Sequence, residues 1–108
     1  MDKRIARRSF ASTLVQLKNP DGSHPLQGEM LDISESGLLI QLDPAAKIHW
    51  PLGTLLKVSC ALPTGPFYAQ AEITRLDTKT SRAGLRWLEF QSPRDHKNLL
   101  ALVTNGFM

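Results

Sequence analysis

This sequence of 108 residues predicts a mainly β fold: a small six-stranded antiparallel β-barrel with a C-terminal α-helix. Six short apolar or alternating segments are separated by turn residues at hairpin spacing, which is typical of small barrels. The last segment changes to helical spacing. A hydrophobic fraction of 42% is sufficient for one core. We therefore expect a single domain over 1–108, with a basic flexible arm at 1–9, the barrel at 10–90 and the helix at 92–104.

The first three strands are expected at residues 10–17, 26–33 and 37–42. Asn-Pro-Asp-Gly at 19–22 is a strong turn signal and ends the first strand. Between the second and third strands lies the polar hinge Asp-Ile-Ser-Glu-Ser-Gly at 32–37. Aspartate and serine can bond nearby backbone amides, and glycine is free to adopt a positive φ, so these residue types favour a tight turn.

The remaining strands are expected at 54–62, 67–76 and 84–90. Apolar and polar residues alternate over 69–74, so the fifth strand should have one solvated face. Period-two alternation in the sixth strand places Leu85, Trp87 and Glu89 on one face, and the residues between them, with Phe90, on the other.

The C-terminal segment carries helix signals from Ser92 onward. Ser92 is a suitable N-cap, Pro93 falls in the first turn where its missing amide costs nothing, and the acidic Asp95 follows. The apolar positions then fall on one side at helical spacing: Leu99, Leu102, Val103 and Gly106, bordered by Leu100 and Phe107. We expect about three helical turns that close one end of the barrel.

The positive charge is concentrated at the N-terminus. The net charge is +3, and Lys3, Arg4, Arg7 and Arg8 stand against Asp2 alone in the first eight residues. Such an arm is typical of a solvated tail, a non-specific nucleic-acid contact or a clamp for a specific phosphate ligand. The residues of the arm alone leave all three interpretations open.

No enzyme or metal site is indicated. His24, His49 and His96 are scattered, with no acidic pair or thiol at ligand spacing, and each is expected on the surface or in a loop. The sequence has no phosphate-binding loop and no dinucleotide fingerprint. Cys60 cannot form an internal disulfide and is expected to be a small core residue. We therefore expect no catalytic residue, no metal and no cofactor.

No apolar run approaches the roughly 20 residues that a membrane helix needs. The basic N-terminus is not followed by an apolar region and a cleavage site. The sequence therefore favours a cytoplasmic protein without a membrane partner.

Two arginines of the arm, Arg4 and Arg8, and the polar hinge at 32–37 together resemble the paired signature of PilZ domains. PilZ domains are bacterial receptors for the second messenger cyclic di-GMP. The similarity covers nearly the whole chain, including Gly-Thr at 53–54, Gly-Leu-Arg-Trp at 84–87, the six-stranded barrel and the C-terminal helix. The motif residues are Arg4-x-x-x-Arg8, followed by Asp32-x-Ser34-x-x-Gly37.

The resemblance implies that Arg4 and Arg8 clamp the ligand. Cyclic di-GMP carries two phosphodiester charges and two guanines, and a guanidinium can bond both phosphate oxygens and guanine O6 and N7. Arg7 is a third candidate contact. Lys3 is a further candidate for phosphate, with a solvated lysine as the alternative.

For the hinge, the resemblance implies Asp32 as the acceptor for guanine N–H groups and Ser34 as a two-way hydrogen bonder. Gly37 would leave room for the base to approach the backbone. Trp87 has two interpretations, core packing and a ring edge that borders the ligand.

The resemblance thus implies a non-enzymatic receptor that binds cyclic di-GMP and signals through arm ordering and an unknown effector protein. One alternative is a PilZ-like adaptor that binds protein and no nucleotide. Another is a basic barrel that binds single-stranded nucleic acid. That alternative is disfavoured because aromatic residues make up 6% of the chain and are not grouped with the arginines, so no specific nucleic acid polymer is expected.

Overall fold

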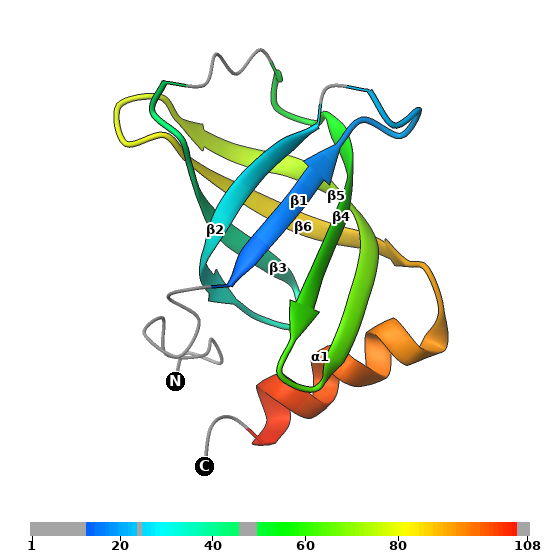
Figure 1. Ribbon diagram of the computed structural model, residues 1–108. Helices are drawn as coiled ribbons and strands as arrows, with labels where there is room; N and C mark the ends of the chain where they lie inside the picture. The colour runs from blue at the N-terminus through cyan, green and yellow to red at the C-terminus, as the bar shows by residue number, and fades with distance from the viewer. Residues whose placement is uncertain (1–12, 24, 46–49, 106–108) are drawn as a thin grey trace.

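The structure is a computed structural model that describes residues 13–23, 25–45 and 50–105. Consecutive neighbours pair antiparallel and close a barrel in the order β1-β2-β3-β6-β5-β4 (Figure 1). The predicted fold class is confirmed. The elements are β1 Leu14–Lys18, β2 Leu26–Ile33, β3 Gly37–Leu42, β4 Leu55–Leu62, β5 Gly65–Asp77, β6 Arg82–Phe90 and α1 Pro93–Asn105.

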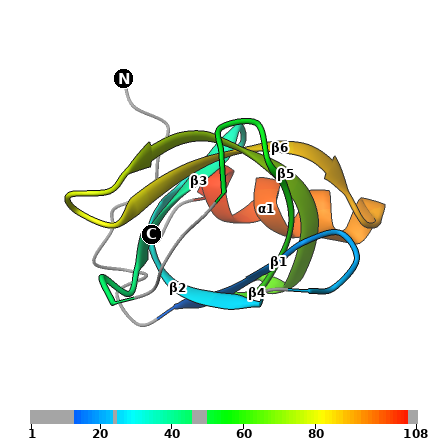
Figure 2. The ribbon, with the colours of Figure 1, turned by 90° about the horizontal axis from the view of Figure 1, so that it is seen from above.

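The interior of the barrel is filled by the inward-facing side chains of all six strands. Helix α1 packs mainly against β5 and lies across one end of the barrel, opposite the loops at the top of Figure 1. Viewed along the barrel, the helix crosses that end on the side of β5 and β6 (Figure 2). Leu99 and Leu102 of α1 are buried in the same core, so the expectation that the helix closes one end is confirmed.

Several strand boundaries differ from those expected. Strand β1 begins at Leu14 rather than at residue 10; residues 10–12 lie outside the described part, and Thr13 precedes the strand. Strand β5 is longer than expected because it pairs with β4 at its start and with β6 as far as the pair Asp77–Arg82. In β5, pairing with the neighbouring strands continues beyond the residues whose apolar and polar side chains alternate.

The face assignment of the sixth strand is wrong beyond Trp87. Ala71 is opposite Trp87 and Gln70 is opposite Glu89, so Leu88 is an extra residue in β6, a β-bulge. The bulge reverses the alternation, because a one-residue slip moves every later side chain to the other face. Glu89 therefore lies outside, and Phe90 turns inward and packs against the core.

Helix α1 begins as the sequence indicates, but the role of Ser92 differs. The Ser92 hydroxyl donates to Asp95 Oδ2 at 2.8 Å, while the backbone carbonyl of Ser92 accepts the Asp95 amide. Asp95 is buried, and its Oδ1 accepts the amide of Tyr68 at 2.8 Å. The aspartate therefore joins the first turn of α1 to β5.

Candidate functional site

The polar hinge forms a tight turn between β2 and β3. The Ser34 amide donates to the Gly37 carbonyl at 2.9 Å, and the Ser34 hydroxyl accepts the amides of Ser36 and Gly37, each at 3.3 Å. A serine side chain that bonds amides two and three residues on stabilises such a turn. Ser34 is thus a capping residue of this turn.

Trp87 of β6 holds the turn against the barrel. Its backbone amide donates to the Ser36 carbonyl at 3.0 Å, and its indole Nε1 donates to the Ser34 carbonyl at 3.1 Å. The ring is 9% exposed and packs edge-on against Phe67, with centroids 5.1 Å apart. Trp87 is therefore part of the core and also holds the backbone of the turn, and a contact between its ring edge and the ligand stays a prediction.

Gly37 is required for a reason other than the expected one. Its φ is not positive, unlike that of Gly22, Gly53 and Gly65, so the expectation of a left-handed glycine is wrong. A Cβ at position 37 would instead collide with the backbone carbonyl of Leu85 on β6. The absence of a side chain lets β3 and β6 approach each other at the end of the turn.

A bulge in β2 places Asp32 on the outer face of the strand, where the residue is still buried. Met30 is opposite Ile40 and Asp32 is opposite Leu39, so Leu31 is the extra residue. Without the bulge, Asp32 would point inward like Met30, and an unpaired carboxylate in an apolar core is very costly. The bulge places Asp32 on the same face as Leu39, where its side chain is 4% exposed, and turns Ile33 into the core.

The arm residues of the predicted site, Lys3, Arg4, Arg7 and Arg8, lie outside the described residues. The point where the arm joins the barrel is described. The Thr13 carbonyl accepts the amide of Met30 at 2.9 Å, so the chain enters the barrel two residues from Asp32, on the neighbouring strand. The five residues from Arg8 to Thr13 span at most about 17 Å when extended, which exceeds the separation of adjacent strands.

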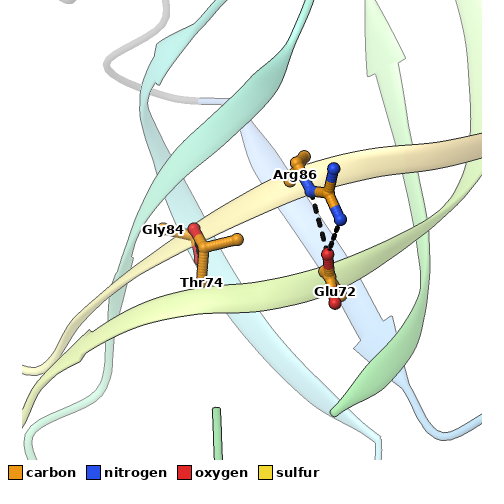
Figure 3. A network of polar contacts seen from close by, with 4 residues as sticks. All are labelled: Glu72, Thr74, Gly84 and Arg86. Carbon is orange, nitrogen blue, oxygen red and sulfur yellow. Dashed lines mark hydrogen bonds and ion pairs between the residues drawn. The ribbon is translucent and has the colours of Figure 1, made fainter. Parts of the chain in front are cut away.

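Register also brings Arg86 to the turn. It lies opposite Gly37 on one side, and on the other its guanidinium pairs with Glu72 of β5, with Nε 2.8 Å from Oε1 (Figure 3). The guanidinium remains mostly exposed. The sequence contains the Gly-Leu-Arg-Trp motif, but the pairing of β3 with β6, which determines the position of Arg86, cannot be read from the motif alone.

The other polar candidates form no second centre in the described chain. Within residues 13–23, 25–45 and 50–105 there is no group of three potential metal ligands and no helix long and apolar enough to cross a membrane. His96 stacks on Phe90 at 4.6 Å, while His24 and His49 lie outside the described residues. Cys60 is half-buried against the core, and burial raises the pKa of its thiol to about 12.

Residues 2–105 match the PilZ domain family. The chain belongs to the PilZ domain family. No curated protein matches it. Several solved structures share the fold of this PilZ domain at low sequence identity.

The PilZ domain of CeSA from a cellulose-synthesizing bacterium is 23% identical, with a TM-score of 0.66 over 94% of this chain and 95% of that chain. The PilZ domain of YcgR from Escherichia coli with c-di-GMP is 21% identical, with a TM-score of 0.71 over 94% and 86%. The Bacillus subtilis inhibitor of motility MotI/DgrA is 21% identical, with a TM-score of 0.69 over 88% of this chain and 46% of that chain. At these identities, the likeness establishes the shared fold.

Proposed function

We propose that this PilZ domain is a non-enzymatic receptor for cyclic di-GMP, which binds between the N-terminal arm and the turn at 34–37. The observation that carries the proposal is the position of Thr13 beside Met30, because it attaches the arm next to the turn. Both halves of the paired motif can thus reach one ligand. The family match and a neighbour solved with c-di-GMP support the choice of ligand.

The N-terminal arm and the hinge at 32–37 supply complementary chemical groups. Arg4 and Arg8, with Arg7 and Lys3 beside them, supply cations for the phosphodiesters and donors for guanine O6 and N7. The carboxylate of Asp32, buried on the outer face of β2, supplies an acceptor for guanine N–H groups. The turn at 34–37 already has its internal hydrogen bonds, so its backbone is ordered before the ligand binds. Binding therefore does not have to offset the conformational entropy of ordering this backbone.

The arm is the part that we expect to respond to the ligand. Four cations and a single sizeable apolar residue, Ile5, offer little to offset the roughly 1 to 2 kcal/mol per residue required to order a backbone. Contacts with phosphate and guanine would offset this cost and fold the arm over the ligand. The ordered arm would present a new surface to an effector protein in the cytoplasm.

Calorimetric titration of the whole chain with cyclic di-GMP tests the proposal. A saturable heat with cyclic di-GMP, and none with a short single-stranded oligonucleotide, is the expected result. An absence of heat with cyclic di-GMP from a protein that melts cooperatively would refute the receptor and favour a protein-binding adaptor. Binding of the oligonucleotide with equal affinity would refute ligand specificity.

A further inference from the structure

A second polar region lies away from the turn. A groove of about 650 Å³ opens on the outer surface of β1, β4, β5 and β6, and no residue of the turn 34–37 lines it. This volume falls within the range of about 300 to 1,000 Å³ that is usual for small-molecule sites. The proposed function makes no use of this groove.

Strand register builds a row of polar side chains along the groove. Lys18 is opposite Lys57, Lys57 is opposite Gln70, and Gln70 is opposite Glu89. Residues directly opposite each other share a face, so the row crosses four strands on the outside of the barrel. With strands about 4.8 Å apart, Lys57 and Glu89 are separated by about 10 Å along the row. Glu89 joins the row only because of the bulge at Leu88.

The charges of the row are separated. Two ammonium groups stand at one end and one carboxylate at the other, and none of the three makes an ion pair within the described residues. Like charges directly opposite each other in a sheet are destabilising. A dianion placed between Lys18 and Lys57 would balance both positive charges, whereas a single negative charge would balance only one of them.

The middle of the groove offers a ring surface. Tyr68 lies opposite Ser59 in the adjacent row, and its side chain is 46% exposed. Phe90 borders the groove beside it, but its ring is turned inward against Phe67. An exposed tyrosine ring beside a row of charged groups is suited to stacking on a planar ring, in particular a nucleobase.

We infer that this groove binds a nucleoside monophosphate. A phosphate monoester is nearly a dianion at neutral pH and lies between Lys18 and Lys57. The base stacks on Tyr68 and directs its N–H donors toward Gln70 and Glu89. Cyclic di-GMP contains only singly charged diesters, so its site at the turn and this groove select different ligands.

NMR titration of the uniformly ¹⁵N-labelled chain with GMP tests the inference. We expect saturable shifts of the amides of residues 57–59, 68–70 and 89–91. Guanosine, which lacks the phosphate, and ribose 5-phosphate, which lacks the base, should each bind at least about tenfold more weakly.

Variants distinguish this groove from the turn. Lys57→Gln should weaken GMP binding about tenfold or more, and Tyr68→Leu about fivefold or more, without loss of the native spectrum. Lys97→Gln, an exposed lysine of α1 outside the groove, is the matched control and should change nothing. Arg8→Ala should also leave GMP binding unchanged, whether or not cyclic di-GMP binds to the turn.

Three results would overturn the inference. The first is an absence of shifts in the groove at millimolar GMP. The second is confinement of the shifts to residues 34–37 and 86–87, which would place GMP in the site at the turn. The third is equal binding of inorganic phosphate and GMP, which would show that the lysines take an anion without recognising a nucleoside.

Discussion

The indole Nε1 of Trp87 donates to the backbone carbonyl of Ser34 at 3.1 Å, and this bond ties the core of the barrel to the turn. The ring of Trp87 packs on Phe67, while its Nε1 atom bonds the backbone of the turn. A buried tryptophan normally requires a partner for its N–H group. Here that partner is the backbone of the candidate binding site.

Replacing Trp87 by Phe should loosen the turn. Phenylalanine retains part of the packing but lacks the donor, so we expect unfolding to become easier by about 1 to 3 kcal/mol. Amide exchange at Ser36 and Gly37 should become faster, and cyclic di-GMP binding a few-fold weaker. Urea unfolding and hydrogen exchange measure these effects, with Trp50→Phe as the control. Unchanged exchange at the turn would contradict the role of the indole bond.

Gly37→Ala should be strongly destabilising although the φ of Gly37 is not positive. The new Cβ would meet the Leu85 carbonyl, and β3 and β6 would have to separate. We expect a loss of about 2 to 4 kcal/mol in the free energy of unfolding. Gly28→Ala is the matched control, because the nearest atoms to its Cβ are at 3.2 Å and a small shift relieves the contact. Equal costs for the two variants would refute this explanation.

Asp32→Asn separates ligand recognition from folding. The substitution preserves the shape of the side chain but removes its charge and one acceptor, so cyclic di-GMP affinity should fall about tenfold or more. Glu29→Gln, on the outer face of the same strand, is the control. Calorimetry and thermal melting measure the two quantities. A lower melting temperature with unchanged affinity would remove Asp32 from the binding site.

The thiol of Cys60 should be unreactive in the folded protein. With its pKa raised from 9.0 to about 12, about one thiol in 10,000 is ionised at pH 8. A thiol reagent at pH 8 should therefore label the protein only after urea is added. The unfolded chain loses this proton above about pH 9 while the folded chain keeps it, so stability should fall as pH rises through that range. Rapid labelling without urea would contradict burial of the thiol.

Apolar segments bounded by turn residues predicted all six strands, and helical spacing predicted the helix, but these patterns could not reveal the bulges. Leu31 and Leu88 are extra residues only with respect to partner strands, and that relation depends on pairing rather than on local sequence. One signal was present for the first bulge. Continued alternation from Met30 would have buried Asp32 in the core, and the high cost of that placement favours a break between them.

The residue types of the candidate site were predictable from the sequence, but their arrangement in space was not. The residue types of the hinge indicated a turn, and Ser34 caps it. The requirement for Gly37 and the nearness of Arg86 both arise from the approach of β3 to β6, two strands far apart in sequence. The roles of the arm residues remain predictions.

Calorimetric titration of Arg8→Ala with cyclic di-GMP, beside the wild type and Arg94→Ala, tests the central claim most directly. Arg94 is an exposed arginine of α1, so its variant matches the charge change outside the site. A charge-assisted contact predicts a loss of about 1.5 to 3 kcal/mol for Arg8→Ala, roughly ten- to more than hundredfold in affinity, with an unchanged melting temperature and wild-type affinity for Arg94→Ala. Binding by Arg8→Ala within twofold of the wild type would contradict the arginine clamp.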